Sequence, residues 1–82
     1  MLKAIVYVTL RESVLDPQGS AVKGALHTLG FAEVADVRIG KYMEVALETD
    51  DREQAVERVR EMAEKLLANT VIEDYRFEIV EG

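Results

Sequence analysis

The sequence predicts a small α+β domain in which four strands and two helices follow one another in the order βαββαβ. Strand-like stretches rich in Val, Ile and Tyr, or with alternating apolar residues, occur at residues 3–10, 33–39, 42–48 and 72–80. Two amphipathic helical repeats lie between them, at residues 17–29 and 55–67. At 82 residues the chain is one domain, 1–82, near the size at which a sheet covered by helices barely buries enough apolar surface to fold alone.

The first strand and the first helix have the clearest boundaries. Residues 3–10 are apolar on both alternating faces, which is typical of a central strand. Asp16 then stands at the expected N-cap, followed by Pro17 at the first helical position, where its missing N–H costs nothing. Helical spacing of apolar residues continues to Leu29, and Gly30 provides the C-terminal stop. A helix is therefore expected over residues 17–29.

The second half of the chain repeats this logic. Alternation over 33–39 resumes after Gly40, which predicts a tight hairpin at residues 38–41 with Gly40 supplying positive φ. Asp51 and Gln54 form a possible capping box for the second helix, and Asn69 is expected to end that helix in the left-handed conformation. The apolar stripe of this helix comprises Ala55, Val56, Val59, Met62, Ala63, Leu66 and Leu67. The last strand is expected to point Tyr75, Phe77 and Ile79 inward and to form a charged edge.

Two right-handed crossovers then give a two-layer sandwich, an antiparallel sheet of order 4-1-3-2 with both helices on one face, the ferredoxin-like arrangement. Three connections share one end of this sheet, namely residues 11–16, 38–41 and 68–71. Polar and charged residues gather in and beside them, as a recognition surface requires. The candidate partner-binding residues are Arg11, Asp16, Gln18, Arg38, Lys41, Asn69, Glu73 and Asp74.

Structural roles compete with partner binding at several of these positions. Asp16 is first a helix cap, Asn69 first a helix terminator, and Gly40 turn geometry. Arg38 and Lys41 stay open between solvated hairpin charges and partner contacts.

Composition excludes several classes of function. Sixteen acidic and ten basic residues give a net charge of −6, which disfavours binding to phosphate backbones. The chain has no cysteine, so a disulfide framework, a thiolate metal site and thiol catalysis are excluded. The one histidine, His27, has no second ligand at metal spacing, and no Gly-rich phosphate loop is present. We expect no catalytic residue, no metal and no bound cofactor; without a signal peptide or membrane span, a cytoplasmic location is expected.

Four ordered motifs point to a family. Residues 14–19 (VLDPQG), 29–31 (LGF), 37–41 (VRIGK) and 66–75 (LLANTVIEDY) resemble, in order and spacing, the PurS family, the small subunit of phosphoribosylformylglycinamidine synthase, also called formylglycinamide ribonucleotide amidotransferase. The resemblance spans nearly the whole chain. Thr70 departs from it, since the family usually has proline after the asparagine, and this puts the rigidity of that turn in doubt.

The resemblance implies a complex of purine biosynthesis. In it a glutaminase subunit releases ammonia from glutamine, and a synthetase subunit uses ATP and that ammonia to convert an amide to an amidine. PurS-like chains catalyse neither half reaction; they form homodimers, bridge the two other subunits and help ammonia to pass between them. ATP and magnesium belong to the synthetase subunit.

Two other classes of function remain to be weighed. One is a small-molecule-sensing regulatory βαββαβ module, with its ligand at a dimer interface near the first strand–helix loop. The other, an RNA-binding sheet, is disfavoured by the acidic charge and by the absence of a basic–aromatic pattern in the third predicted strand. The uncovered sheet face and the two outer strands also predict a symmetric homodimer with sheet-mediated contact.

Overall fold

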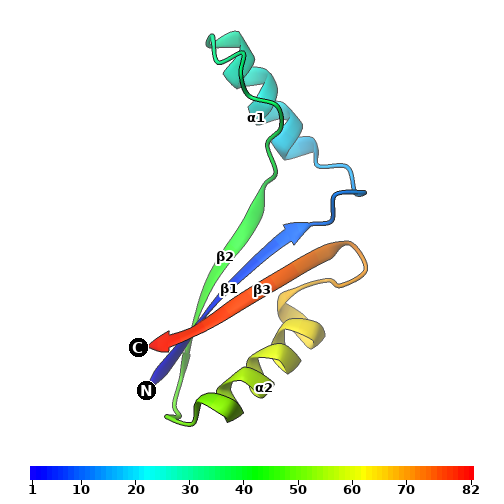
Figure 1. Cartoon of the computed structure of the whole chain (residues 1–82). Coiled ribbons are helices and arrows are strands. Elements are labelled where there is room, and N and C mark those ends of the chain that lie inside the picture. Colours follow the sequence, from blue (N-terminus) through cyan, green and yellow to red (C-terminus); the bar gives the residue numbers. More distant parts are fainter.

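A three-stranded antiparallel sheet with one helix against it forms the body of the molecule, and a second helix projects from the end of the sheet (Figure 1). The computed structural model describes all 82 residues. Its elements are β1 (Leu2–Leu10), α1 (Pro17–Thr28), β2 (Gly40–Leu47), α2 (Arg52–Met62), the π-helical turn η1 (Ala63–Leu67) and β3 (Glu73–Glu81). The molecule measures 48 × 26 × 14 Å and its Cα radius of gyration is 16.1 Å. A compact chain of this length has a radius of about 12 Å, so much of this one lies outside a common core.

The strands are ordered β2-β1-β3. The central strand β1 pairs with β2 from Leu2 to Thr9 and with β3 from Leu2 to Leu10, both antiparallel. The prediction that this strand is central, made from the apolar residues on both of its faces, is therefore confirmed. The predicted α+β class with an antiparallel sheet is confirmed, and the neighbours 4-1-3 of the predicted order 4-1-3-2 are present as β3-β1-β2.

The core lies between β1 and α2. It consists of Leu2, Ala4, Val6, Val8, Leu47, Ala55, Val59 and Ala68. Alternate residues of β1 supply half of this cluster because successive side chains of a strand point to opposite faces. Only 11 of the 82 residues are buried, and α2 packs mainly on β1 and β3, so the same face of β2, with Met43 and Val45, is left without a helix above it.

Residues 33–39 do not form the predicted second strand. They run back along α1 instead, where the carbonyl oxygen of Val34 lies 2.8 Å from Nε2 of His27. The carbonyl of Val37 passes so close to Gly19 that a Cβ on this glycine would lie 2.1 Å from its oxygen. The backbone of 33–39 therefore finds its partners on α1, and its alternating apolar residues serve that contact rather than a sheet.

Two further expectations fail for the same reason. The predicted hairpin at residues 38–41 is absent, because the chain runs directly from 33–39 into β2 (Figure 1). The two helices do not share one sheet face, since α1 extends beyond the end of β1 instead of returning over the sheet. Gly40 has no positive φ; only Gly30 does, at 100°. Gly40 is instead required by close approach, because a Cβ there would lie 2.4 Å from the carbonyl oxygen of Val8.

The helix starts are as predicted, but the end of α2 is not. Asp16 accepts a hydrogen bond from the amide of Gly19 at 2.9 Å, and Asp51 accepts one from the amide of Gln54 at 3.2 Å. Asn69 is not left-handed, because no residue other than glycine has positive φ. The helix instead widens into the π-helical turn η1.

Of the two leucines predicted to be buried at the end of this helix, Leu66 and Leu67, the π-helical turn leaves only one facing the core. It adds a residue to the last turn and so rotates the following side chains around the helix axis. Leu67 is therefore half-buried, whereas Leu66, predicted to belong to the buried stripe, is 83% exposed.

Candidate docking surface

The three connections predicted to share one end of the sheet do meet there, and Arg11 ties them together. Its backbone amide donates to the carbonyl of Ile72 at 2.9 Å, and its guanidinium donates to the carbonyl of Thr70. The guanidinium of Arg38 donates in turn to the carbonyl of Arg11 at 2.8 Å. We call this region, residues 11–16, 38–41 and 66–74, the docking end.

Asp16 holds α1 to the start of β2. Its side chain is only 5% exposed, and its two carboxylate oxygens accept from the amides of Gly19 and Ile39, the latter at 2.8 Å. These hydrogen bonds, that from Ile39 first, lower the pKa of Asp16 below its usual range because they favour the charged carboxylate. Asp16 is thus a cap and a latch at once, and its carboxylate is largely occupied within the chain.

Arg38 is likewise occupied by the chain itself. One of its terminal nitrogens lies within hydrogen-bond distance of three carbonyl oxygens, those of Leu10 at 3.4 Å, Arg11 at 2.8 Å and Val14 at 3.0 Å. Carbonyls that no strand partner reaches are satisfied in this way. Two roles were left open for Arg38, that of a solvated hairpin charge and that of a partner contact. The structure adds a third, because Arg38 fixes the loop after β1 through these hydrogen bonds.

Two ion pairs also lie at the docking end. Arg11 lies 3.7 Å from Asp74, and Lys41 lies 3.7 Å from Glu73. Both side chains of the first are exposed, whereas the carboxylate of the second, that of Glu73, is only 12% exposed. A carboxylate oxygen of Glu73 also accepts from the backbone amide of Asn69 at 2.7 Å, which links the turn after η1 to β3. These pairs hold the loops in place without exhausting the charges that face solvent.

Gln18 joins the same region from the first turn of α1. It lines a small cavity of about 200 Å³ together with Asp16, Lys41 and Glu73. All the candidate partner-binding residues therefore gather at or beside the docking end, although Asp16 and Arg38 have clear structural tasks there.

Apolar side chains are the part of the docking end that sequence reasoning missed. Within residues 66–74, Leu66 is 83% exposed and Val71 82% exposed, and Ile72 is exposed as well; Leu15 is exposed in the loop 11–16. Exposed apolar side chains grouped on a rigid frame are typical of protein interaction sites. The sequence signal was present in the run 66–72, but helical periodicity assigned Leu66 to the core.

The opposite face of the sheet is uncovered, as predicted, and its polar side chains find partners among one another. The rings of Tyr7 and Tyr42 meet edge to face at 5.6 Å, and the guanidinium of Arg76 lies 3.9 Å from the centre of the Tyr7 ring. The Tyr7 hydroxyl donates to Glu78 at 3.0 Å, and this bond raises the pKa of Tyr7 above its usual range. Polar partners thus lie within the face itself, which reduces its tendency to bind apolar surfaces.

No three side chains of His, Cys, Asp or Glu gather as a metal-binding group. The nearest partner of His27 is the carbonyl of Val34, so this side chain supports the fold. No helix has the length and apolar content needed to cross a membrane.

Comparison with known proteins identifies the family. The family model PurS, described as phosphoribosylformylglycinamidine (FGAM) synthase, matches residues 3–81. The PurS subunit of phosphoribosylformylglycinamidine synthase from Bacillus subtilis is 65% identical over 81 residues, which cover 99% of this chain and 95% of the relative. The corresponding subunit from Methanocaldococcus jannaschii is 40% identical over 79 residues, covering 96% and 95%.

Solved structures agree over nearly the whole chain. B. subtilis PurS superposes with a TM-score of 0.86 at 65% identity, covering 99% of this chain and 100% of that one. M. jannaschii PurS, a subunit of formylglycinamide ribonucleotide amidotransferase in the purine biosynthetic pathway, has a TM-score of 0.88 at 39% identity, covering 100% and 99%. A chain of the PurLQS structure from Thermotoga maritima has a TM-score of 0.85 at 30% identity, covering 98% and 99%. The chain therefore belongs to the PurS family, the small subunits of phosphoribosylformylglycinamidine synthase.

Proposed function

We propose that this chain is a non-catalytic bridging subunit of phosphoribosylformylglycinamidine synthase, which joins the glutaminase and synthetase subunits and assists the transfer of ammonia between them. The observation that carries the proposal is the docking end, where Leu66 and Val71 stand almost fully exposed on loops held by hydrogen bonds and ion pairs. In this role the chain binds no cofactor, and ATP and magnesium are held by the synthetase. The cytoplasmic location expected from the sequence stays a prediction.

A bridging subunit needs a surface that is ordered before its partner arrives. Loops that must be ordered on binding reduce affinity, whereas preordered loops do not. At the docking end, Arg11 and Arg38 fix the loop after β1, and Glu73 fixes the turn before β3. The exposed apolar side chains are therefore presented in one geometry, with Lys41 and Asp74 as a charged rim.

We also propose that the subunit acts as a symmetric homodimer in which each copy covers the other with its arm, defined as α1 and residues 29–39. The apolar residues of the arm, among them Val22, Leu29 and Phe31, are exposed in the single chain. The face of β2 beside α2, with Met43 and Val45, lacks the second helix that the sequence led us to expect. An exchanged α1 fills that place, and twofold symmetry satisfies both open faces at once.

The sheet itself contributes to this dimer. β2 is an edge strand, so the backbone groups on its outer side have no partner within the chain. Residues 33–39 and β2 form one long extended path, along which a second copy can lie (Figure 1). Sheet-mediated contact and arm exchange are therefore compatible in one interface.

The bridging role is tested by reconstitution with the glutaminase and synthetase subunits, with Val71→Ser as the test variant. We expect glutamine-dependent amidine formation to require this chain. A higher concentration of the Val71→Ser variant than of the wild type should be needed for the same rate, because an exposed apolar contact with the partner is lost. Supplying ammonium salt in place of glutamine should remove the requirement. Equal glutamine-dependent rates with and without the chain would refute bridging, and a requirement that persists with ammonium salt would refute a role in ammonia transfer.

A small-molecule-sensing module remains the second candidate function, with the cavity of about 200 Å³ at the base of the arm as its ligand site. Asp16 in this cavity already accepts from two backbone amides, which leaves less hydrogen-bonding capacity for a ligand. Calorimetric titration with amino acids and nucleotides distinguishes the two. Micromolar binding to the isolated chain would favour sensing.

A further inference from the structure

The free edge of β3 offers unpaired backbone groups. β3 forms one border of the sheet, with β1 as its only neighbour. Near its two ends, the amide of Glu73 bonds to Asn69 and the carbonyl of Ile79 accepts from Arg52 at 2.7 Å, so neither group points to β1. Backbone groups alternate in direction along a paired antiparallel strand. The amides and carbonyls of Tyr75 and Phe77 therefore also face outward, where a further strand would lie.

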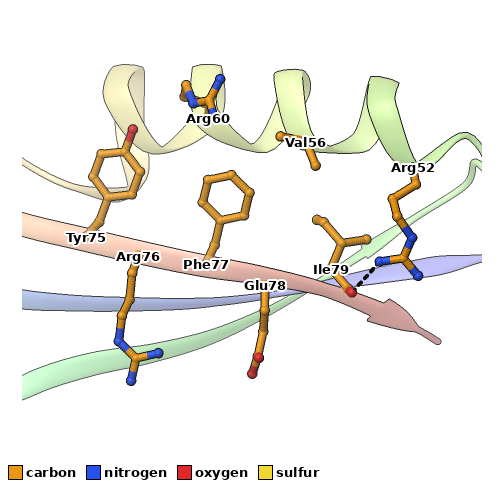
Figure 2. Close-up of a pocket in the computed structure, with 8 residues that line it drawn as sticks. All are labelled: Arg52, Val56, Arg60, Tyr75, Arg76, Phe77, Glu78 and Ile79. Atoms are coloured by element: carbon orange, nitrogen blue, oxygen red, sulfur yellow. Dashed lines mark hydrogen bonds between the residues drawn. The ribbon is translucent and has the colours of Figure 1, made fainter.

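A groove open to solvent runs along this edge, between β3 and α2, and four of its eight lining residues are hydrophobic. Its volume is about 520 Å³. Figure 2 shows Tyr75, Phe77 and Ile79 pointing from β3 toward α2, where Val56 faces them. These side chains are only half-buried, so the groove still presents apolar surface to a partner.

Three arginines surround the groove, and none of them takes part in an ion pair of the molecule. Arg52 and Arg60 stand on α2, two turns apart, and Arg76 points to the other side of the sheet (Figure 2). Arg52 donates to a carbonyl and Arg76 lies over the Tyr7 ring, whereas Arg60 has no hydrogen-bond partner. Glu78 lines the groove as well, and Glu64 accepts from the Tyr75 hydroxyl at 3.2 Å at one end of it, so three positive charges face two negative ones. A net positive charge therefore remains beside the free strand edge in a chain of net charge −6.

We propose that this edge binds an extended acidic segment of another protein by strand addition. The backbone of the segment pairs with Tyr75 and Phe77, which gives affinity without regard to sequence. Carboxylates at alternate positions reach Arg52 and Arg60 above the apolar floor, and this gives selectivity for acidic sequences. On the other side of the sheet a further carboxylate meets Arg76.

One carboxylate of the chain also lines the groove. Glu78 accepts from the Tyr7 hydroxyl at 3.0 Å on the side of the sheet away from α2. The residue of the bound segment opposite Glu78 is therefore neutral or basic, which distinguishes the expected partner from a uniformly acidic tail.

A second copy of β3 is the competing occupant. An antiparallel pair centred on Phe77 would set Arg76 opposite Glu78 of the other copy, but it would also bring together the Arg52 and Arg60 residues of both copies. Like charges on the α2 side oppose that arrangement, so an acidic strand is the better complement. The edge is separate from the docking end and from the arm, and the inference therefore stands independently of the bridging role.

The test uses the full-length protein, labelled with ¹⁵N, and two capped hexapeptides, one alternating valine with glutamate and one alternating valine with lysine. Titration of the glutamate peptide should shift the amide resonances of Tyr75, Phe77 and Ile79 most, and the lysine peptide should leave them unmoved. Arg60→Glu should weaken binding of the glutamate peptide by about tenfold. Arg58→Glu is the matched control, because Arg58 lies on the same helix but outside the groove, paired with Glu61 at 3.5 Å.

Unmoved amides at the β3 edge, or equal shifts with both peptides, would overturn the proposal. So would equal weakening by the two variants, since this would reflect net charge alone. Sedimentation of Arg76→Glu completes the test, because this change would place a carboxylate opposite Glu78 of a second copy and so weaken a β3–β3 pair. A lower mass than that of the wild type would assign the edge to a second copy and refute an acidic partner, whereas equal masses are expected.

Discussion

Replacing Leu29 with serine should dissociate the arm-exchanged dimer without unfolding the subunit. Leu29 ends α1 and is 72% exposed in the single chain, so little packing within the subunit is lost. Burying a whole leucine side chain contributes about 1.5–3 kcal/mol, and the exposed part available to a partner is therefore worth about 1–2 kcal/mol. Twofold symmetry doubles this to about 2–4 kcal/mol, which raises the dissociation constant of the dimer by about 30-fold to 900-fold.

Sedimentation equilibrium of the wild type and the variant measures this constant directly, with far-ultraviolet circular dichroism as the check on folding. The matched control is Leu66→Ser, which makes the same chemical change at an 83% exposed position of the docking end, away from the arm. We expect only Leu29→Ser to shift the equilibrium. An unchanged constant for Leu29→Ser, or an equal effect of Leu66→Ser, would refute arm exchange.

Three other substitutions probe the latch, the rim and the core. Asp16→Asn places an amide donor against the backbone amide of Ile39 and should therefore lower the thermal midpoint. In the wild type the pKa of Asp16 is lowered, so the carboxylate stabilises the fold fully above the ordinary aspartate pKa. This stabilisation is lost as the pH falls through the lowered pKa. A melting series through the acid range should therefore show a steeper decline for the wild type, and parallel curves would contradict the latch. Lys41→Glu should weaken assembly with the other subunits in a pull-down. It should move the thermal midpoint by less than about 5 °C, because the lysine end of its ion pair with Glu73 is 64% exposed; equal loss of folding would contradict its place on the rim. Val59→Ala removes two methyl groups from a fully buried position and should cost about 2–3 kcal/mol in denaturant unfolding, and a cost below about 1 kcal/mol would mean that the core relaxes around the site.

Local signals in the sequence predicted most elements of the sheet and helices. Asp16 and Asp51 cap the two helices as predicted because a side-chain acceptor at the first turn acts within a few residues. β1 is central because both of its faces are apolar. The meeting of three connections at one end followed from strand directions alone, and it survives although α1 lies elsewhere than expected.

The arm could not be predicted, because an alternating pattern of apolar and polar residues does not reveal which segment pairs with the backbone of residues 33–39. Residues 33–39 alternate as a strand does, yet their backbone bonds to His27 and Asp16. The available signal was Gly19, because a glycine inside a helix lowers its stability and is often kept where another segment packs closely. Here it allows the carbonyl of Val37 to approach α1. Leu66 was assigned to the core wrongly because the π-helical turn in which it lies, Ala63–Leu67, has no local sequence signal.

The candidate site was predictable in position but not in the roles of its residues. Arg38 was open between solvent and partner, and only the structure shows its three carbonyl acceptors, which belong to a loop more than twenty residues earlier in the chain. The arginines of the β3 groove were missed because Arg52 and Arg60 come near Arg76 only after α2 packs on the sheet. Their spacing of eight residues on one helix face was the sole trace in the sequence.

Amidine formation by the mixed glutaminase and synthetase subunits, measured with and without this chain and with either glutamine or ammonium salt, tests the central claim most directly. Bridging predicts that the chain is required with glutamine and dispensable with ammonium salt. A glutamine-dependent rate that is the same in its absence would contradict the bridging role.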